Sequence, residues 1–175
     1  LLICLLLNIA VFEMDNNFLL VVLFLLINAV VLFITDHSSR GNKDASRMTG
    51  LDGIIMGISG ALSAFPGISR TGMIISYSIS RGANMQNGIN WAVLLSIPAL
   101  FFAVLFDGYL MTVIAGGSLS FLSIISYLFS GIGAFAGGYA GISLLQLILN
   151  RSGFSSFAYY SFGTALLSFV LYLIT

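Results

Sequence analysis

A single arginine interrupts a long apolar stretch at a point where the chain also carries a helix-breaking Pro-Gly pair. Arg70 follows Pro66-Gly67 within the segment 64–76, whose other residues are mostly apolar or small. An arginine at bilayer depth costs at least ~3 kcal/mol on insertion scales, so such a residue faces a polar partner, a cavity or a ligand. Arg70 is therefore the first candidate for chemistry, and the chemistry that suits a guanidinium is the binding of an anion.

The residues next to Arg70 are those that a helix start uses to hold a phosphate. If a helix begins near Thr71, with Ser69 or Arg70 at its cap position, its first N–H groups have no intrahelical acceptor and the helix dipole is positive there. Ser69 and Thr71 add hydroxyl donors, and Gly67 and Gly72 let the backbone approach a ligand closely. The planar fork of Arg70 matches phosphate oxygens two at a time. The pattern predicts a phosphate-binding turn.

The plainer interpretation of this turn is structural. Pro66-Gly67 then ends one helix, Ser69 caps the next, and Arg70 reaches toward the membrane surface or pairs with an acid. In a soluble protein that interpretation would be favoured. At membrane depth a guanidinium is too costly to keep for a turn alone, so we favour anion binding.

The composition indicates a membrane protein and excludes several other classes. Hydrophobic residues make up 59% of the chain and charged residues only 7%, whereas soluble domains carry about 25% charged residues. The formal net charge is zero, so no basic surface for nucleic acid is expected. Cys4 and His37 are the only residues of their kinds, so we expect no intrachain disulfide and no metal site. His37 lies between Asp36 and Ser38, which suggests a catalytic triad, but its place in a basic loop favours a solvated side chain.

Apolar runs long enough to cross a bilayer predict an all-α, polytopic integral membrane protein. Full runs cover 18–35, 89–106, 119–149 and 155–174, and crossing requires roughly 20 residues. A shorter run, 1–12, opens the chain without an initiator methionine or a basic leader, so it is not a signal peptide. We therefore expect a single membrane domain over residues 1–175 that lacks part of its amino-terminal side.

The segment 51–83 is expected to form a re-entrant helix-loop-helix hairpin. Pro66-Gly67 divides it into two apolar halves that are each too short to cross a bilayer alone. Irregular backbone at membrane depth is tolerated where protein buries it or a polar cavity receives it, so the turn should line a polar pocket. A polar, basic loop over 36–50 precedes the hairpin.

The charges predict an orientation, because basic residues gather in cytoplasmic loops. If the hairpin returns to its starting side, the basic residues outside the turn face the cytoplasm: Arg40, Lys43, Arg47, Arg81 and Arg151. Three acidic residues then face outward, as does the carboxyl terminus: Glu13, Asp15 and Asp107. The same parity would result if both halves crossed fully, so the charges do not fix the depth of the hairpin.

Three further polar or small-residue features have structural interpretations. Asp52 begins the hairpin, where a carboxylate caps a helix and suits its dipole. Asn28 lies within a predicted span and suits an interhelical hydrogen bond. A run of glycines has small-xxx-small spacing, which favours close helix packing and leaves a homodimer open: Gly131, Gly133, Gly137, Gly138 and Gly141.

Several stretches together resemble the bacterial undecaprenyl-diphosphate phosphatases, the bacitracin-resistance membrane proteins. The stretches 52–57, 61–72 and 94–99 are similar in order and spacing to the second signature region of that family, and 61–72 contains Pro-Gly-Ile-Ser-Arg-Thr-Gly. The ending 154–160 resembles the family's last helix. The resemblance covers nearly all of this chain and corresponds to the carboxyl-terminal two thirds of the family.

The resemblance implies an enzyme in the bacterial plasma membrane that removes the terminal phosphate from undecaprenyl diphosphate and so recycles a cell-wall lipid carrier. It implies two inverted repeats, each with a re-entrant hairpin, that meet at one site. Ser69 and Arg70 would act on the diphosphate, with Arg70 stabilising charge on the phosphoryl oxygens. Thr71 and Gly72 would complete the cradle begun by Gly67.

Two departures limit what this chain is expected to do by itself. The family's first signature, which supplies carboxylates, a serine and a histidine, is absent from the sequence. Ile74 stands where the family usually has a threonine, and Ser76 is the nearby candidate for that hydroxyl. The chain thus carries the binding half of a site; a lipid-phosphate transporter or flippase, or an inactive fragment, is the alternative. No cofactor is evident, although a strongly anionic diphosphate leaves a divalent cation open.

Overall fold

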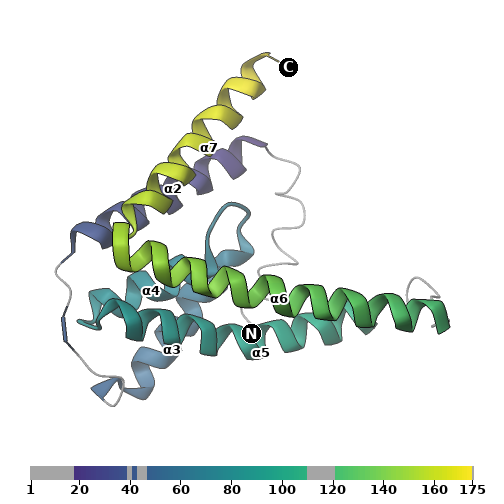
Figure 1. Ribbon diagram of the computed structural model, residues 1–175. Helices are drawn as coiled ribbons and strands as arrows, with labels where there is room; N and C mark the ends of the chain where they lie inside the picture. Colours follow the sequence, from purple (N-terminus) through teal and green to yellow (C-terminus); the bar gives the residue numbers. More distant parts are fainter. Residues whose placement is uncertain (1–17, 39–40, 43–46, 110–120, 175) are drawn as a thin grey trace.

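The computed structural model describes residues 18–38, 41–42, 47–109 and 121–174, and these are almost entirely helical (Figure 1). The helices are α2 (Phe18–His37), α3 (Gly50–Ala61), the short 3-10 helix η2 (Leu62–Ala64), α4 (Arg70–Ser80), α5 (Met85–Tyr109), α6 (Phe121–Ser152) and α7 (Ser155–Ile174).

Four of these helices are long and apolar enough to cross a membrane. They correspond to Phe18–His37, Met85–Phe106, Ile125–Arg151 and Ser155–Ile174. A helix of 20 residues spans ~30 Å, the thickness of the hydrocarbon core. The predicted all-α polytopic membrane fold is confirmed. The predicted first run, 1–12, lies outside the described residues.

The helix-loop-helix prediction for 51–83 is also confirmed, and local chemistry explains both helix starts. Thr49 and Asp52 form a reciprocal capping box: the Thr49 hydroxyl accepts the Asp52 N–H, and the Asp52 carboxylate accepts the Thr49 N–H at 2.9 Å. Asp52 is thus the structural cap that the sequence predicts. Pro66-Gly67 forms the turn, and Gly67 has a φ of 97°, a left-handed value that favours glycine.

The helices form two antiparallel pairs around the hairpin. In Figure 1, α2 lies beside α7 and α5 beside α6, and the two pairs meet at one end and diverge toward the other. Helix α4 lies between them and contacts α2, α3 and α5. Its buried side chains Ile74, Ile75 and Ile79 join the apolar core with Met56 of α3 and Ile89 of α5. The start of α4 is therefore fixed by several neighbouring elements.

Two polar contacts join helix ends that are far apart in the sequence. The Asp36 carboxylate at the end of α2 accepts hydrogen bonds from the backbone N–H of Phe154, at 2.8 Å, and of Ser155. The Asp52 carboxylate accepts a hydrogen bond from Arg81 Nε at 2.7 Å, which closes the open end of the α3–α4 hairpin. Because this ion pair joins the start of α3 to the residue after α4, the two ends of the hairpin lie close together.

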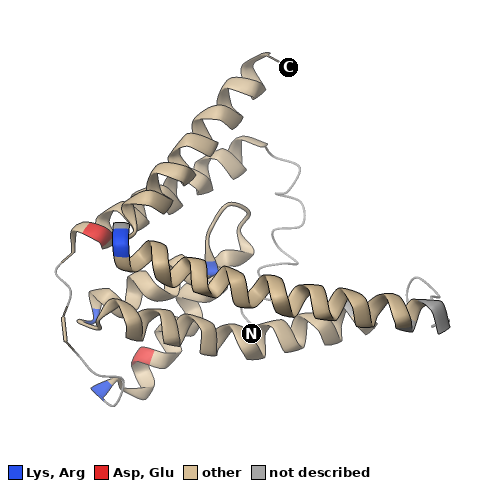
Figure 2. Ribbon diagram, viewed as in Figure 1, with Lys and Arg blue, Asp and Glu red and all other residues tan. Residues whose placement is uncertain are grey.

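Charged residues gather at the end of the molecule where α2 meets α7 and where the α3–α4 hairpin opens (Figure 2). Among the residues that the structure describes with their side chains, Asp36, Arg47, Asp52, Arg81 and Arg151 belong to the ends of helices or to the connections between them, whereas Arg70 lies at the inner turn. Arg70 is thus set apart from the other described charged residues, and the predicted orientation in the membrane stays a prediction.

Some boundaries differ from the sequence prediction. Helix α2 continues through Asp36 and His37, so the loop expected over 36–50 begins two residues later and ends where α3 starts at Gly50. His37 is exposed and its Nδ1 lies 2.9 Å from the Phe33 carbonyl oxygen, in the last turn of that helix. Helix α5 begins four residues before the predicted run and contains Pro98, which a membrane helix tolerates when neighbours compensate the lost hydrogen bond.

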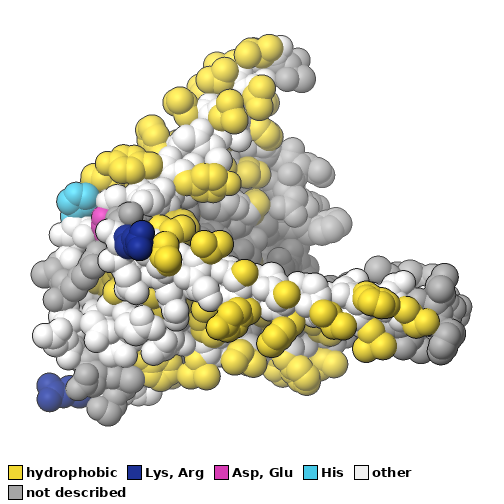
Figure 3. Space-filling view, viewed as in Figure 1, with side chains coloured by type: hydrophobic (Ala, Val, Ile, Leu, Met, Phe, Trp, Pro, Cys, Tyr) yellow, Lys and Arg dark blue, Asp and Glu magenta, His cyan; other side chains and the backbone are white. Residues whose placement is uncertain are grey.

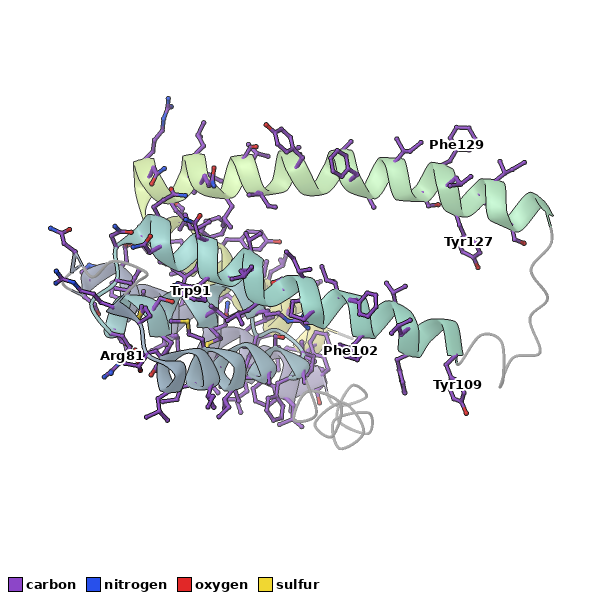
Figure 4. All side chains as sticks on the ribbon, turned by 90° about the horizontal axis from the view of Figure 1, so that it is seen from below. Arg81, Trp91, Phe102, Tyr109, Tyr127 and Phe129 are labelled. Carbon is purple, nitrogen blue, oxygen red and sulfur yellow. The ribbon has the colours of Figure 1, made fainter. Side chains whose placement is uncertain are left out.

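The glycine stripe of α6 does not pack as expected within the described chain. Its five glycines are exposed, and a Cβ at any of them would meet no described atom within 4 Å. Apolar side chains spread over α6 and α7 (Figure 3), and Phe129 and Tyr109 project away from the α5–α6 pair (Figure 4). These apolar faces suit lipid or another protein surface rather than water.

Candidate functional site

Ser69, one of the two cap positions that the sequence predicts, is the N-cap of α4. Its backbone is extended, with φ of −80° and ψ of 117°, and its hydroxyl oxygen accepts the Gly72 N–H at 3.1 Å. The Ser69 carbonyl oxygen accepts the Met73 N–H at 3.0 Å. The first helical residue is Arg70, one position before the expected start. This cap satisfies two of the amide groups at the helix start.

Two other amide groups at this start remain available. Within the described ranges no hydrogen bond is made by the backbone N–H of Arg70 or of Thr71. Both belong to the first turn of a helix, whose dipole makes this end positive. Together with the Thr71 hydroxyl they form a set of donors suited to the oxygens of an anion.

The Arg70 side chain lies along the hairpin. Its Nε donates a hydrogen bond to the Ser63 hydroxyl of η2 at 3.0 Å, and the residue is half-buried. No carboxylate in the described part of the chain pairs with it. The guanidinium is therefore anchored through one nitrogen, and its two terminal nitrogens keep their donors for another group.

A cavity of about 560 Å³ opens beside the turn. One wall comes from the turn itself, through Gly67, Ser69, Thr71 and Gly72. The opposite residues come from α2, α6 and α7 and are mainly apolar, with three polar side chains among them: Asn28, Tyr160 and Ser161. The cavity thus combines a polar helix start with apolar walls, the composition expected for a ligand that has a polar head and an apolar body.

The structure places the six predicted site residues in two groups. Gly67, Ser69, Thr71 and Gly72 line the cavity, whereas Arg70 and Ser76 do not. Ser76 is buried in α4, and its hydroxyl has no hydrogen-bond partner in the described regions.

The two glycines of the turn lie against α2. A Cβ at Gly67 would lie 3.1 Å from the Val21 carbonyl oxygen, and a Cβ at Gly72 would lie 2.8 Å from Leu32 Cδ2. The sequence predicted close approach of a ligand at these positions. In the structure a neighbouring helix makes that close approach.

Asn28 contacts the turn in a way that the sequence did not indicate. The predicted interhelical hydrogen bond is confirmed, because Asn28 Nδ2 donates to Ser161 Oγ of α7 at 3.1 Å. Its Oδ1 also accepts the Ser69 N–H at 3.0 Å, across 41 positions of sequence. The only sequence signal for this contact was a lone amide within an apolar run.

Electrostatics at the base of the hairpin favour the charged forms of both partners. The Thr49 backbone N–H and then the Arg81 guanidinium lower the pKa of Asp52 below its usual 3.8. The Asp52 carboxylate in turn raises the pKa of Arg81. Asp52 lies outside the four candidate spans, and its ion pair closes the hairpin without contributing to the cavity.

Comparison with known proteins identifies the family. The family model of bacitracin resistance protein BacA matches residues 1–167. The chain belongs to the BacA family. The turn, the Ser69 cap and the cavity therefore lie within the part of the chain that the BacA model covers.

Curated relatives in this family carry the name undecaprenyl-diphosphatase. A protein of Methanosphaera stadtmanae is 31% identical over 85% of this chain and 52% of its own length, and one of Thermosipho melanesiensis is 30% identical over 89% and 58%. One of Carboxydothermus hydrogenoformans is 28% identical over 77% and 51%. The chain spans about half the length of the curated relatives it matches. No solved structure gives a significant match.

Proposed function

We propose that the protein to which this chain belongs hydrolyses undecaprenyl diphosphate to undecaprenyl phosphate and phosphate, and that this chain supplies the diphosphate-binding half of the site. Membership of the BacA family and the names of its relatives support the reaction. The observation that carries the assignment is the capped start of α4, where two unbonded N–H groups lie at a turn that lines a largely apolar cavity. Arg70 is the first residue of this helix and, although it does not line the cavity, keeps its two terminal nitrogens available.

In this reaction the oxygen of water bonds to the terminal phosphorus, and the bond from that phosphorus to the bridging oxygen breaks. Negative charge is spread over the phosphoryl oxygens in the transition state. Arg70 and the N–H groups of Arg70 and Thr71 would stabilise that charge, and Ser69 would hold the helix start in place. Gly67, Thr71 and Gly72 would line the headgroup site, and Ser76 would offer a hydroxyl deeper in α4.

The hairpin is proposed to be re-entrant, dipping into the plasma membrane from the cytoplasmic side. Helices α3 and α4 have 12 and 11 residues, so each is about 18 Å long or less, against a hydrocarbon core of ~30 Å. The Asp52–Arg81 ion pair supports a common side for both ends. With basic residues on the cytoplasmic side, the carboxyl terminus lies outside.

The exposed glycines of α6 support a second proposal, which concerns assembly. Small residues let helices approach closely in lipid, so this stripe is where a second copy of the protein would pack. A divalent cation that neutralises the diphosphate also remains a prediction. In the part of the chain that the structure describes, no group of three or more His, Cys, Asp or Glu residues could hold one.

Release of phosphate from undecaprenyl diphosphate by the purified full-length protein tests the function. Arg70→Ala removes charge-assisted hydrogen bonds made in the transition state and should lower kcat/KM about a hundredfold, which corresponds to ~3 kcal/mol. Arg70→Lys keeps the charge but loses the fork and should recover only part of the activity. Arg151→Ala removes an exposed cation elsewhere and should change little.

Two results would contradict the proposal in different ways. A full-length protein that binds the lipid but releases no phosphate would favour a carrier over an enzyme. An active protein in which Arg70→Ala has the rate of the unchanged enzyme would remove Arg70 from the site.

A further inference from the structure

We propose that Asn28 is a positioning residue that sets the register of the α4 start through the Ser69 amide. The proposal rests on the proposed function, because it concerns the placement of the donors that would bind the diphosphate. It assigns Asn28 no contact with the reacting atoms.

The orientation of the Asn28 amide follows from the chemistry of its partners. Its side chain is buried, with 3% of the residue exposed. The Ser69 backbone N–H can only donate, so the Asn28 atom that faces it at 3.0 Å must be the oxygen. The amide nitrogen then faces Ser161 Oγ at 3.1 Å on α7. A single side chain thus connects α2, α4 and α7.

The contact surface on α2 shows why Asn28 governs the position of the turn. Val21, Leu25 and Leu32 lie on the same face of α2 as Asn28, at helical spacing. Val21 and Leu25 lie against Gly67, and Leu32 lies against Gly72, so this face follows the turn on both sides of Ser69. Asn28 is the polar member of these four residues and supplies the hydrogen bond in an otherwise apolar contact.

The consequence for the site concerns which amide groups remain free. The Asn28 side-chain oxygen accepts a hydrogen bond from the Ser69 N–H. The Ser69 hydroxyl oxygen accepts one from the Gly72 N–H, and the Ser69 carbonyl oxygen accepts one from the Met73 N–H. The N–H groups of Arg70 and Thr71 are therefore the two left for an anion among these five consecutive amides. Without Asn28 the Ser69 N–H would need a new partner, and the turn would shift relative to the cavity.

Three variants of the full-length protein separate positioning from simple helix packing. Asn28→Leu removes the hydrogen bonds to Ser69 and Ser161 and replaces the amide with an apolar side chain of similar size. Ser161→Ala removes only the partner on α7 and leaves the Ser69 contact. Asn28→Asp keeps an acceptor for the Ser69 N–H and for the Ser161 hydroxyl but adds a negative charge near the headgroup site.

Positioning predicts unequal effects on phosphate release. Asn28→Leu should lower kcat/KM at least tenfold, whereas Ser161→Ala should stay within about threefold of the unchanged protein. Asn28→Asp should lower the thermal unfolding midpoint, because an added carboxylate is costly at a buried position within a span, and should raise KM more than it lowers kcat, because its charge repels a diphosphate. If Asn28 only ties α2 to α7, Asn28→Leu and Ser161→Ala will have equal effects, and the proposal is overturned.

A second measurement keeps the proposal testable without enzymatic activity. Backbone amide hydrogen exchange, measured by mass spectrometry on peptides covering residues 65–75, should be faster in Asn28→Leu than in Ser161→Ala. Unchanged exchange in a folded Asn28→Leu protein overturns the positioning role. If the unchanged protein releases no phosphate but exchange behaves as expected, the proposed function fails while the role of Asn28 in ordering the turn stands.

Discussion

Substitution of Gly67 by alanine tests whether the turn before α4 is held against the backbone of α2. Its φ of 97° is in the left-handed region, where an ordinary residue costs ~1–2 kcal/mol. A Cβ at this position would also lie 3.1 Å from both the Val21 carbonyl oxygen and the Leu25 nitrogen, which are backbone atoms inside a helix. Overpacking of this kind adds about 1–3 kcal/mol. We therefore expect Gly67→Ala to lower the free energy of unfolding by ~2–5 kcal/mol.

Gly82 provides a matched control for the conformational part of that cost. Its φ is 87°, and nothing lies within 4 Å of its Cβ position. Gly82→Ala should therefore cost only ~1–2 kcal/mol. Gly57→Ala, within α3 and equally free of neighbours, should stabilise the protein by about 0.5–1 kcal/mol.

The comparison requires denaturant unfolding of the three variants and the unchanged full-length protein in the same detergent. Phosphate release measured on the same samples shows whether a displaced turn also lowers activity. If Gly67→Ala is no more destabilising than Gly82→Ala, the turn can move away from α2 without cost. The close contact would then not fix the site, and the reasoning that links it to the cavity would be wrong.

Two further predictions concern the helix cap and the hairpin base. Ser69→Ala should destabilise the protein by ~1 kcal/mol in thermal unfolding, because the cap is lost. Ser69→Asp should keep the cap but lose phosphatase activity, because its negative charge repels the diphosphate. An active Ser69→Asp protein would argue against anion binding at this helix start. Because the pKa of Asp52 is lowered below 3.8, the stability from this carboxylate is present above about pH 4 and is lost only as pH falls through the lowered pKa. Arg81→Ala should therefore reduce the thermal unfolding midpoint at pH 7. As the pH falls, the variant should begin to lose stability at a higher pH than the unchanged protein. Identical dependence of stability on pH in the two proteins would contradict a stabilising role for the Asp52–Arg81 ion pair.

Much of the helical framework could be predicted from the sequence because it depends on contiguous residues. Runs of apolar residues of known length predict spans, and Pro66-Gly67 predicts a break because proline and glycine alter the local backbone. A cap at Ser69 or Arg70 and the cap role of Asp52 could be predicted for the same reason, and the structure adds Thr49 as the partner of Asp52, three residues away.

The glycine stripe of α6 shows where such local rules stop. Its spacing predicts close packing, but spacing does not say which surface will approach it, and the described helices leave it exposed. The placement of Arg70 is a second example. The sequence indicated a polar partner for its guanidinium, but only packing of α4 against η2 decided that Ser63 supplies one contact and that the side chain lies outside the cavity lining.

The sequence by itself determined which segments are long and apolar enough to cross a membrane, where the hairpin breaks, and that Ser69 or Arg70 caps α4. Tertiary structure alone decided that Asn28 holds Ser69, that Asp52 meets Arg81, and that α2 and α7 complete the cavity. The physical reason is sequence separation. Hydropathy and capping act between neighbours along the chain, whereas contacts across 29, 41 or 133 positions exist only once packed helices bring their partners within hydrogen-bond distance.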